Sequence, residues 1–377
     1  MPAGLDECLA LASFHALSIR QGIFFRGNTR WKNIAEHRGI PTMTGLLVRA
    51  FLAALALFAG LSQVSARELR LSHQWPESDA RHKASRVLMA ELKKRGTGLT
   101  ISLHPNSSLK FKAVEQYDAM IEGKLEMTVY PIAYQSAKIP EFSIGLLPGV
   151  PSSSETASLL KGSQFEDKLQ RLCEARGFRV LTWWWVGGGV ASRAQEFGGP
   201  ATVKGLRARG GDRAFDEMLA AAGASTLSMP SNEIRTAMEA DKLDVALTSF
   251  ESLMSFRVTE HSKFATLGGN GIWVTFTPVI ISKAVWDSLS DDERQALEEA
   301  ARASNIYFDA TQREALESAQ EAFTKAGAKV RELTFDEYAA WLHVARDSSW
   351  KTYQSISPQA AELFAAMLQS FIDSGKR

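Results

Sequence analysis

Cysteine is nearly absent from this sequence: 377 residues contain two, Cys8 and Cys173. Cys8 lies in an N-terminal stretch that differs from the rest, so the main part of the chain can form no internal disulfide. A chain this long buries enough apolar surface to fold without one, even in an oxidising compartment. Cys173 lies among leucines in a helical pattern, and we expect it to be a buried small hydrophobe.

Charge of one sign is also lacking, since 43 Lys and Arg residues stand against 42 Asp and Glu. This balance argues against a nucleic-acid-binding face, which would be strongly basic. The sequence has no HExxH, no G-x-S-x-G, no Walker loop, and no metal-ligand spacing among the histidines at 73, 82, 104, 261 and 343. We therefore expect no catalytic residues, no metal and no cofactor. The glycines at 187–189 follow an apolar run without opening a helix, so we interpret them as a flexible crossover.

Long hydrophobic runs are missing as well. The longest near the N-terminus, residues 50–61, is shorter than the roughly 20 residues that span a bilayer. Arg49 precedes it, and Val64-Ser65-Ala66 supplies small residues at a cleavage site. We predict a signal peptide at 43–66, cleaved after Ala66, and interpret residues 1–42 as a mis-annotated extension. A retained membrane anchor is the alternative.

What the sequence does contain is a repeated alternation of strand and helix patterns. Strands are predicted at 67–73, 99–104, 126–130, 178–186, 206–210, 226–229, 243–248 and 273–282, with helices between most of them. This pattern predicts an α/β fold, and the number of units predicts two lobes. Lobe I is assigned 67–190 plus roughly 275–310, and lobe II 191–274 plus the C-terminal helices to 377. A capping box at Ser290 and Glu293 opens a helical pattern that continues towards residue 327, long enough to brace both lobes. A second capping box, Thr334 with Glu337, opens another helix.

Two arginines stand out as candidate binding residues. Arg207 and Arg209 lie two apart on a short strand, so their side chains point to opposite faces. One of them can face a cleft and hold a carboxylate through two parallel hydrogen bonds. The alternative is a surface strand on which both arginines are solvated.

Tryptophans offer a second set of candidates. Trp183, Trp184 and Trp185 are consecutive on a predicted strand, and Trp185 is the one carried as a candidate ligand contact. Trp75 and Trp273 lie at predicted loop positions, where contacts to ligands are common. Each of these rings could equally be core packing.

Several segments, taken in order, resemble the DctP-type extracytoplasmic solute-binding proteins of TRAP (tripartite ATP-independent periplasmic) transporters. They are the strand at 71–73, the segment 97–106, Val203-Lys204-Gly205-Leu206-Arg207-Ala208-Arg209, the segment 230–238 with Leu243-Asp244, and the segment 278–289. The resemblance covers residues 67–345. It implies a two-lobed periplasmic binding protein fold that closes on its ligand, with the long C-terminal helix bracing both lobes.

The resemblance also implies a function and a site. The matching position makes Arg209 the residue that grips a small organic acid, with Thr248 and Ser249 nearby after the "vD" strand and Arg193 near the place of a second arginine. The implied partners are the small and large integral membrane subunits of the transporter, and the implied location is the periplasm. Asp244-Val245 and Arg209-Gly210-Gly211 depart from the family pattern, so the identity of the acid stays open. A receptor for an ABC importer or a sensor kinase, and a periplasmic enzyme, are the alternatives.

Overall fold

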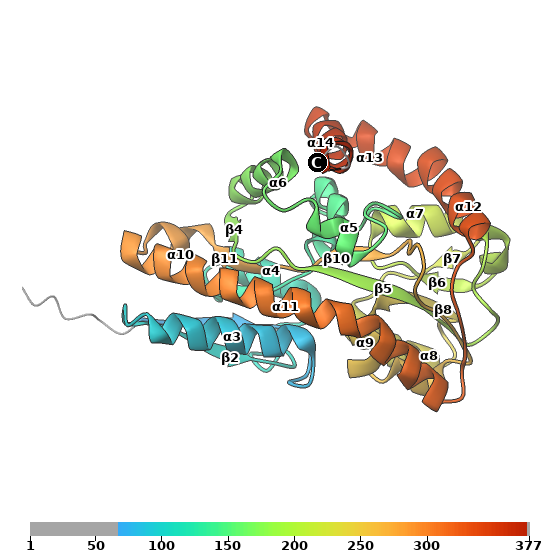
Figure 1. Cartoon of the computed structure of the whole chain (residues 1–377), viewed down its shortest axis with the longest axis horizontal. Helices are drawn as coiled ribbons and strands as arrows, with labels where there is room; N and C mark the ends of the chain where they lie inside the picture. The colour runs from blue at the N-terminus through green and yellow to red at the C-terminus, as the bar shows by residue number, and fades with distance from the viewer. Residues whose placement is uncertain (1–66, 375–377) are drawn as a thin grey trace, which may run out of the picture. The chain divides into compact units, whose positions relative to one another are not determined.

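Two β-sheets organise the chain in the computed structural model, which describes residues 67–374 (Figure 1). The predicted extension at 1–42 and the predicted signal peptide at 43–66 lie outside the described residues. Within residues 67–374, no helix combines the length and the apolar character needed to cross a membrane.

The first lobe is built on a five-stranded sheet. In spatial order its strands are β2 (Leu99–His104), β1 (Arg67–Ser72), β3 (Met127–Val129), β11 (Val279–Ser282) and β4 (Phe178–Val180). β1 is parallel to β2 and β3, whereas β11 is antiparallel to both its neighbours. Helix α3 (Ala80–Lys94) connects β1 to β2 and buries Leu88 and Leu92, four residues apart, in the core of this lobe. Helix α4 (Gln116–Ile121) precedes β3.

The second lobe is built on a seven-stranded sheet. Its strands are, in spatial order, β12 (Lys329–Arg331), β9 (Phe264–Thr266), β5 (Trp185–Ser192), β8 (Val245–Ser249), β6 (Arg207–Arg209) and β7 (Ser225–Thr226), with β10 (Val274–Phe276) paired to β5. The helices of this lobe include α7 (Arg213–Ala221), α8 (Ile234–Glu239) and α9 (Phe250–Ser255). The α/β class and the two-lobed architecture predicted from the sequence are therefore confirmed.

Two segments predicted as single strands are instead the connections between the lobes. The apolar run 178–186 divides into β4 in the first sheet and the start of β5 in the second. The run 273–282 divides in the same way into β10 and β11, at Thr277 and Pro278. Pro278 has no N–H for a ladder hydrogen bond, which favours a break there. The two connections run together, because the Thr277 N–H donates to the Trp184 carbonyl at 2.9 Å.

The glycine triplet at 187–189 is not a flexible crossover, as the sequence had suggested, but the buried middle of strand β5. A Cβ on Gly188 would lie 2.3 Å from the Thr248 carbonyl oxygen and from the Trp273 ring. A Cβ on Gly189 would lie 2.6 Å from Leu267. The glycines therefore allow close packing around a central strand rather than movement.

One long helix, α11 (Asp291–Lys325), runs along both lobes (Figure 1). It begins with the predicted capping box, in which Ser290 and Glu293 each accept a backbone N–H of the other. Its 35 residues give a length of about 50 Å. It packs on α3 of the first lobe and on α9 of the second, so it braces both lobes. The short helix α10 (Lys283–Asp287) precedes it.

The C-terminal helices divide between the lobes, which differs from the predicted assignment of all of them to lobe II. Helix α12 (Phe335–Ala345), opened by the predicted Thr334 and Glu337 box, buries Trp341 in the second lobe. Helices α13 (Lys351–Ile356) and α14 (Pro358–Ser374) return to the first, where α14 packs on α6 (Gln164–Ala175). The predicted boundary at 190 also falls inside β5 rather than between the sheets.

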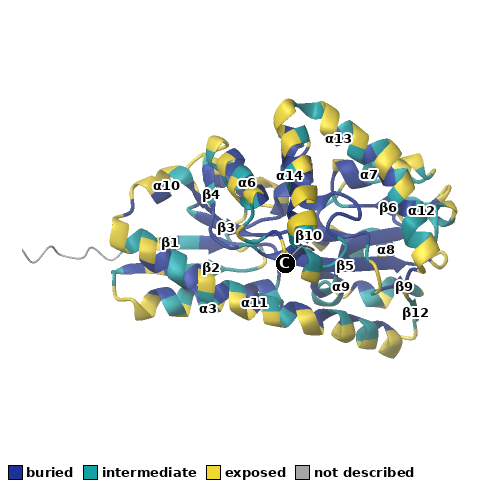
Figure 2. Ribbon diagram, turned by 45° about the horizontal axis from the view of Figure 1, so that its top comes forward, coloured by how far each residue is buried: buried dark blue, intermediate teal, exposed yellow. Residues whose placement is uncertain are grey.

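Burial follows this arrangement of sheets and helices. In Figure 2 the central strands of both sheets are buried, whereas α11 and α14 each show an exposed outer face. Cys173 on α6 is fully buried, as predicted, and burial raises the pKa of its thiol well above the usual value. The short helix α5 (Ser154–Ser158) precedes both lobe connections in the sequence.

Candidate functional site

A small cavity lies where the two lobes meet. It receives residues from both lobes, near the carboxyl ends of β1, β3, β6 and β8, which is the edge where open α/β sheets bind ligands. Its lining is Trp75, Arg81, Pro131, Ala133, Tyr134, Leu146, Arg209, Gly211, Ser231, Thr248, Ser249, Ser252, Trp273, Thr275 and Thr277. The cavity volume is about 20 Å³, little more than one water molecule requires.

Five of the predicted site residues line this cavity: Trp75, Arg209, Thr248, Ser249 and Trp273. They come from segments that are far apart in the sequence, and the closure of the two lobes brings them together. The cavity is therefore the candidate site.

Arg209 is buried in the cavity wall, with 1% of its surface exposed. Its Nε donates to the Met229 carbonyl at 3.0 Å and its Nη1 donates to the Leu247 carbonyl at 2.6 Å. Among the described residues, no carboxylate forms an ion pair with it. A guanidinium has five N–H groups, so three remain for another acceptor. The arrangement fixes the plane of the guanidinium and leaves these three N–H groups without a carboxylate partner among the described residues.

Glycine at position 211 makes room for this guanidinium. Gly211 has φ of +113°, and a Cβ there would lie 2.9 Å from Arg209 Nη1. The neighbouring Gly210 carbonyl accepts a hydrogen bond from Trp273 Nε1 at 2.7 Å. The departure from the family pattern at 210–211 thus has a structural reason, because these two positions pack directly against the site.

Arg81 is a cavity residue that the sequence analysis missed. It lies in the first turn of α3 and forms a two-pronged ion pair with Asp79, through Nε to Oδ1 and Nη2 to Oδ2, both at 2.8 Å. Its carbon Cζ sits 3.9 Å from the centroid of the Trp75 ring. No sequence motif marks this position, and the buried pair becomes visible only in three dimensions.

Arg81 also connects the two lobes. Its Nη1 donates to Ser249 Oγ at 3.3 Å and its Nη2 donates to Ser252 Oγ at 3.1 Å, both at the N-terminus of α9. Trp75 Nε1 donates to the same Ser252 Oγ at 3.1 Å, and Ser255 Oγ donates to Asp79 at 2.9 Å. The first lobe therefore holds α9 through side-chain hydrogen bonds that all pass beside the cavity.

Two threonine hydroxyls complete the wall on the connection between the lobes. Thr275 and Thr277 are 4% and 0% exposed, and their Oγ1 atoms have no hydrogen-bond partner among the described residues. Because unpartnered buried hydroxyls are costly, these atoms are suited to a polar group held in the cavity.

The electrostatics of the site follow from burial and from the Arg81–Asp79 pair. Burial opposes the charge on Asp79, but the Arg81 guanidinium outweighs it and holds the pKa of Asp79 below its usual value. Burial, with a smaller effect of His82, lowers the pKa of His73 to about 3, so this histidine is neutral behind the site. Burial raises the pKa of Glu251.

Two predicted site residues lie elsewhere. Trp185 packs between Phe165 and Phe276 in a buried hydrophobic cluster. Arg193 is on the surface, where it pairs with Asp241 at 2.7 Å. Both predictions are wrong for this cavity, because the first side chain points into a core and the second away from the lobe junction.

The opposite-face prediction for the two arginines is confirmed. Arg207 pairs with Asp244, whose two oxygens accept from Arg207 Nε at 2.8 Å and from Nη2 at 2.5 Å, at a partly exposed position. Arg209, two residues on, faces the cavity.

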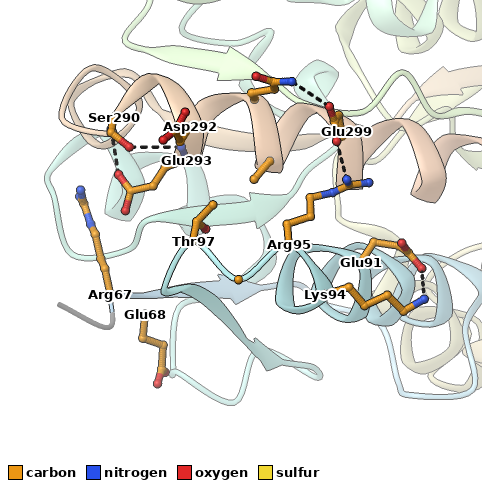
Figure 3. Close-up of a pocket in the computed structure, with 13 residues that line it drawn as sticks. Arg67, Glu68, Glu91, Lys94, Arg95, Thr97, Ser290, Asp292, Glu293 and Glu299 are labelled. Atoms are coloured by element: carbon orange, nitrogen blue, oxygen red, sulfur yellow. Dashed lines mark hydrogen bonds and ion pairs between the residues drawn. The ribbon is translucent and has the colours of Figure 1, made fainter. Parts of the chain in front are cut away.

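A much larger hollow lies on the surface between α3 and the start of α11 (Figure 3). Its volume is about 1310 Å³, but its lining consists mainly of exposed charged side chains. These pair with one another: Lys94 with Glu91 at 2.5 Å, and Arg95 with Glu299. The hollow is therefore a charged surface on which several of the side chains pair with one another. Among residues 67–374, no cluster of three His, Cys, Asp or Glu residues is placed to hold a metal ion.

This chain is similar to several known proteins. Residues 71–355 match the family model DctP, described as bacterial extracellular solute-binding protein, family 7. A "Solute-binding protein" of Albidiferax ferrireducens is 36% identical over 327 residues, which cover 85% of this chain and 96% of that protein. The 2,3-diketo-L-gulonate-binding periplasmic protein YiaO of Escherichia coli is 26% identical over 262 residues, 68% of this chain and 78% of that protein.

One similar solved structure contains a ligand. It is the crystal structure of a TRAP periplasmic solute-binding protein from Rhodoferax ferrireducens with bound malonate. It is 35% identical, has a TM-score of 0.78, and covers 81% of this chain and 99% of its own.

Proposed function

The chain belongs to bacterial extracellular solute-binding protein family 7, the DctP family, whose members are receptors rather than enzymes, and from this premise we propose that it captures a small organic acid in the cavity between its lobes. The acid's carboxylate is gripped by Arg209. The receptor then delivers the acid to the small and large integral membrane subunits of a TRAP transporter.

The single observation that carries the proposal is that three N–H groups of the Arg209 guanidinium remain available to a ligand. Two of its N–H groups are fixed by the Met229 and Leu247 carbonyls, and the rest are unclaimed by any described carboxylate. A buried cation without a counter-ion is unfavourable, and an incoming carboxylate removes that cost. The guanidinium plane is already oriented, so little further ordering is needed.

Location in the periplasm agrees with this role. The predicted signal peptide at 43–66, with cleavage after Ala66, would bring the two lobes there. The malonate found in the Rhodoferax relative supports a small acid as the class of ligand.

The proposal is tested by replacing each of the two neighbouring arginines. We expect Arg209→Ala to lose the acid-induced rise in melting temperature and to weaken binding by about tenfold to a hundredfold, the equivalent of a charge-assisted contact of about 1.5–3 kcal/mol. Isothermal calorimetry with a panel of organic acids measures this directly.

Arg207→Ala is the matched control, since Arg207 lies on the same strand but pairs with Asp244 outside the cavity. It should keep the affinity of the unmodified protein. Equal affinities in the Arg209→Ala variant and the unmodified protein would refute the assignment of the grip to Arg209.

A further inference from the structure

Two arginines line the cavity, but only one of them has charge to offer a ligand. Four of the five N–H groups of Arg81 are occupied: Nε and one on Nη2 by Asp79, one on Nη2 by Ser252, and one on Nη1 by Ser249. The Asp79 carboxylate is fully buried and holds both prongs of the guanidinium. The charges of Arg81 and Asp79 therefore cancel inside the wall.

Two carboxyl groups near the cavity reduce its positive charge when they are ionised. Glu251, on α9, is buried; its Oε1 accepts from Gln312, and its Oε2 has no partner among the described residues. Asp216, on α7, accepts the Gly210 N–H at 3.0 Å and interacts with the charge of Arg209. If either carboxyl is ionised, the cavity becomes less positive. Among the residues that line the cavity, the excess is at most one charge, that of Arg209.

A second negative charge on the ligand would have no counter-ion in this wall. The cavity is small and its lining is largely buried, so bulk water solvates a second charge there poorly. The unclaimed polar atoms near Arg209 are hydroxyls, the Oγ1 atoms of Thr275 and Thr277. Hydroxyls can donate to a carboxylate or pair with a neutral hydroxyl, carbonyl or amide, but they bring no charge.

We propose that the cavity accepts an acid that carries a single negative charge when bound, and that Asp79 sets this limit by neutralising Arg81. The inference rests on the proposed function and narrows its ligand class. It covers monocarboxylates with neutral polar groups. It also covers dicarboxylic acids such as malonate, provided that they take up a proton on binding.

The first experiment compares each dicarboxylate with its own monoamide, which has nearly the same shape and one charge fewer. Malonate with malonamate and succinate with succinamate are measured by calorimetry on the purified protein at a pH where both carboxylates are ionised in solution. We expect the monoamide to bind at least about tenfold more tightly, and a diacid to take up about one proton per site, read from buffers of different ionisation enthalpy. A dianion that binds as tightly as its monoamide without proton uptake would overturn the proposal.

The second experiment releases Arg81 by the substitution Asp79→Asn. Asparagine caps a helix as well as aspartate does, so the start of α3 is kept while the countercharge is removed. We expect the preference to shift by at least about tenfold towards the diacid. An unchanged ratio in a folded Asp79→Asn protein would contradict the role of Asp79. If this variant does not fold, the comparison in the unmodified protein still decides the single-charge limit.

Glu126→Gln is the matched control. Glu126 forms a similar fork with Arg70 in the same lobe, through Nε at 2.8 Å and Nη2 at 2.8 Å, away from the cavity. Its substitution changes the net charge by the same amount and should leave the diacid-to-monoamide ratio unchanged.

The two proposals fail in different ways. If no acid binds, or if Arg209→Ala binds every acid as well as the unmodified protein does, the proposed function fails. If acids bind through Arg209 but the dianion is preferred, only the single-charge limit fails.

Discussion

At the scale of single residues, the site depends on how each arginine is neutralised. Arg207 and Arg209 are two apart on β6, yet the first is paired with Asp244 and the second with no described carboxylate. Arg81, from the other lobe, is as deeply buried as Arg209 but already has its carboxylate. Arginine thus plays a different part at each of the three positions. What differs between the positions is the partner of the guanidinium, not the residue type.

Gly211 gives a prediction at this scale. Gly211→Ala places a Cβ 2.9 Å from Arg209 Nη1, at a φ of +113° that side chains rarely adopt. We expect a loss of stability of about 1–3 kcal/mol and at least a tenfold loss of acid affinity, because the guanidinium must move. Urea unfolding and calorimetry measure the two effects.

Gly205→Ala separates strain from displacement of the arginine. Gly205 also has a positive φ, +77°, but a Cβ there meets nothing within 4 Å. It should lose stability and keep its affinity. An equal loss of affinity in both alanine variants would show that the contact between Gly211 and Arg209 does not determine the acid affinity.

The sequence identified the residue-scale features that depend on spacing and missed those that depend on tertiary contacts. The two-residue spacing placed Arg207 and Arg209 on opposite faces, and the family pattern selected Arg209. Trp185 was wrongly placed because a strand pattern does not say which face meets a cleft. Arg81 was missed because its significance lies in contacts with α9, 168 and 171 residues away.

At the scale of elements, local signals fixed helix ends well and strand membership less well. The capping boxes at Ser290 and Thr334 were predicted and are present. The runs 178–186 and 273–282 read as single strands because their apolar character continues from one lobe into the other. The apolar pattern of a sequence reflects burial, and the chain stays buried where it passes from one sheet to the other.

Helix α11 supports a prediction at the scale of elements. Ile306 lies near its middle and is 74% exposed, so its side chain contributes little packing. Ile306→Pro removes a helical hydrogen bond and clashes with the preceding turn, and we expect it to destabilise the protein by about 3 kcal/mol or more. Thermal unfolding followed by circular dichroism measures the change.

The control for this prediction is Ile306→Ala, which keeps the helix and should change stability little. The residues beside Ile306 contact the connection between the lobes. Asn305 Oδ1 accepts the backbone N–H of Trp183 at 3.0 Å, and Phe308 stacks on Trp184 with ring centroids 4.6 Å apart. A proline variant as stable as the alanine variant would show that α11 does not brace the lobe connections.

At the scale of the whole described unit, the small volume of the cavity implies that the lobes must separate to admit a ligand. Its volume of about 20 Å³ is too small for an acid the size of malonate. The groups that close it are side-chain hydrogen bonds across the lobe junction, from Arg81 and Trp75 to α9 and from the Ser231 N–H to Tyr134 at 3.0 Å. Such contacts can break and re-form without disturbing either core.

This feature leads to a prediction about lobe motion. We expect the protein free of ligand to sample an open arrangement, and a tightly binding acid to shift the population towards the closed one. Small-angle X-ray scattering should show a smaller radius of gyration when the acid is added. No change on adding a saturating acid would contradict the need for lobe separation.

The buried thiol of Cys173 makes such movement easy to follow in another way. Within residues 67–374 it is the sole cysteine, it is fully enclosed, and its thiolate is disfavoured. Maleimide dyes should therefore not react with it. In a protein that begins at Arg67, and so lacks Cys8, a pair of cysteines introduced at exposed positions, one on each lobe, can be labelled without first removing Cys173. Fluorescence energy transfer between one donor dye and one acceptor dye on these two cysteines then reports the distance between the lobes.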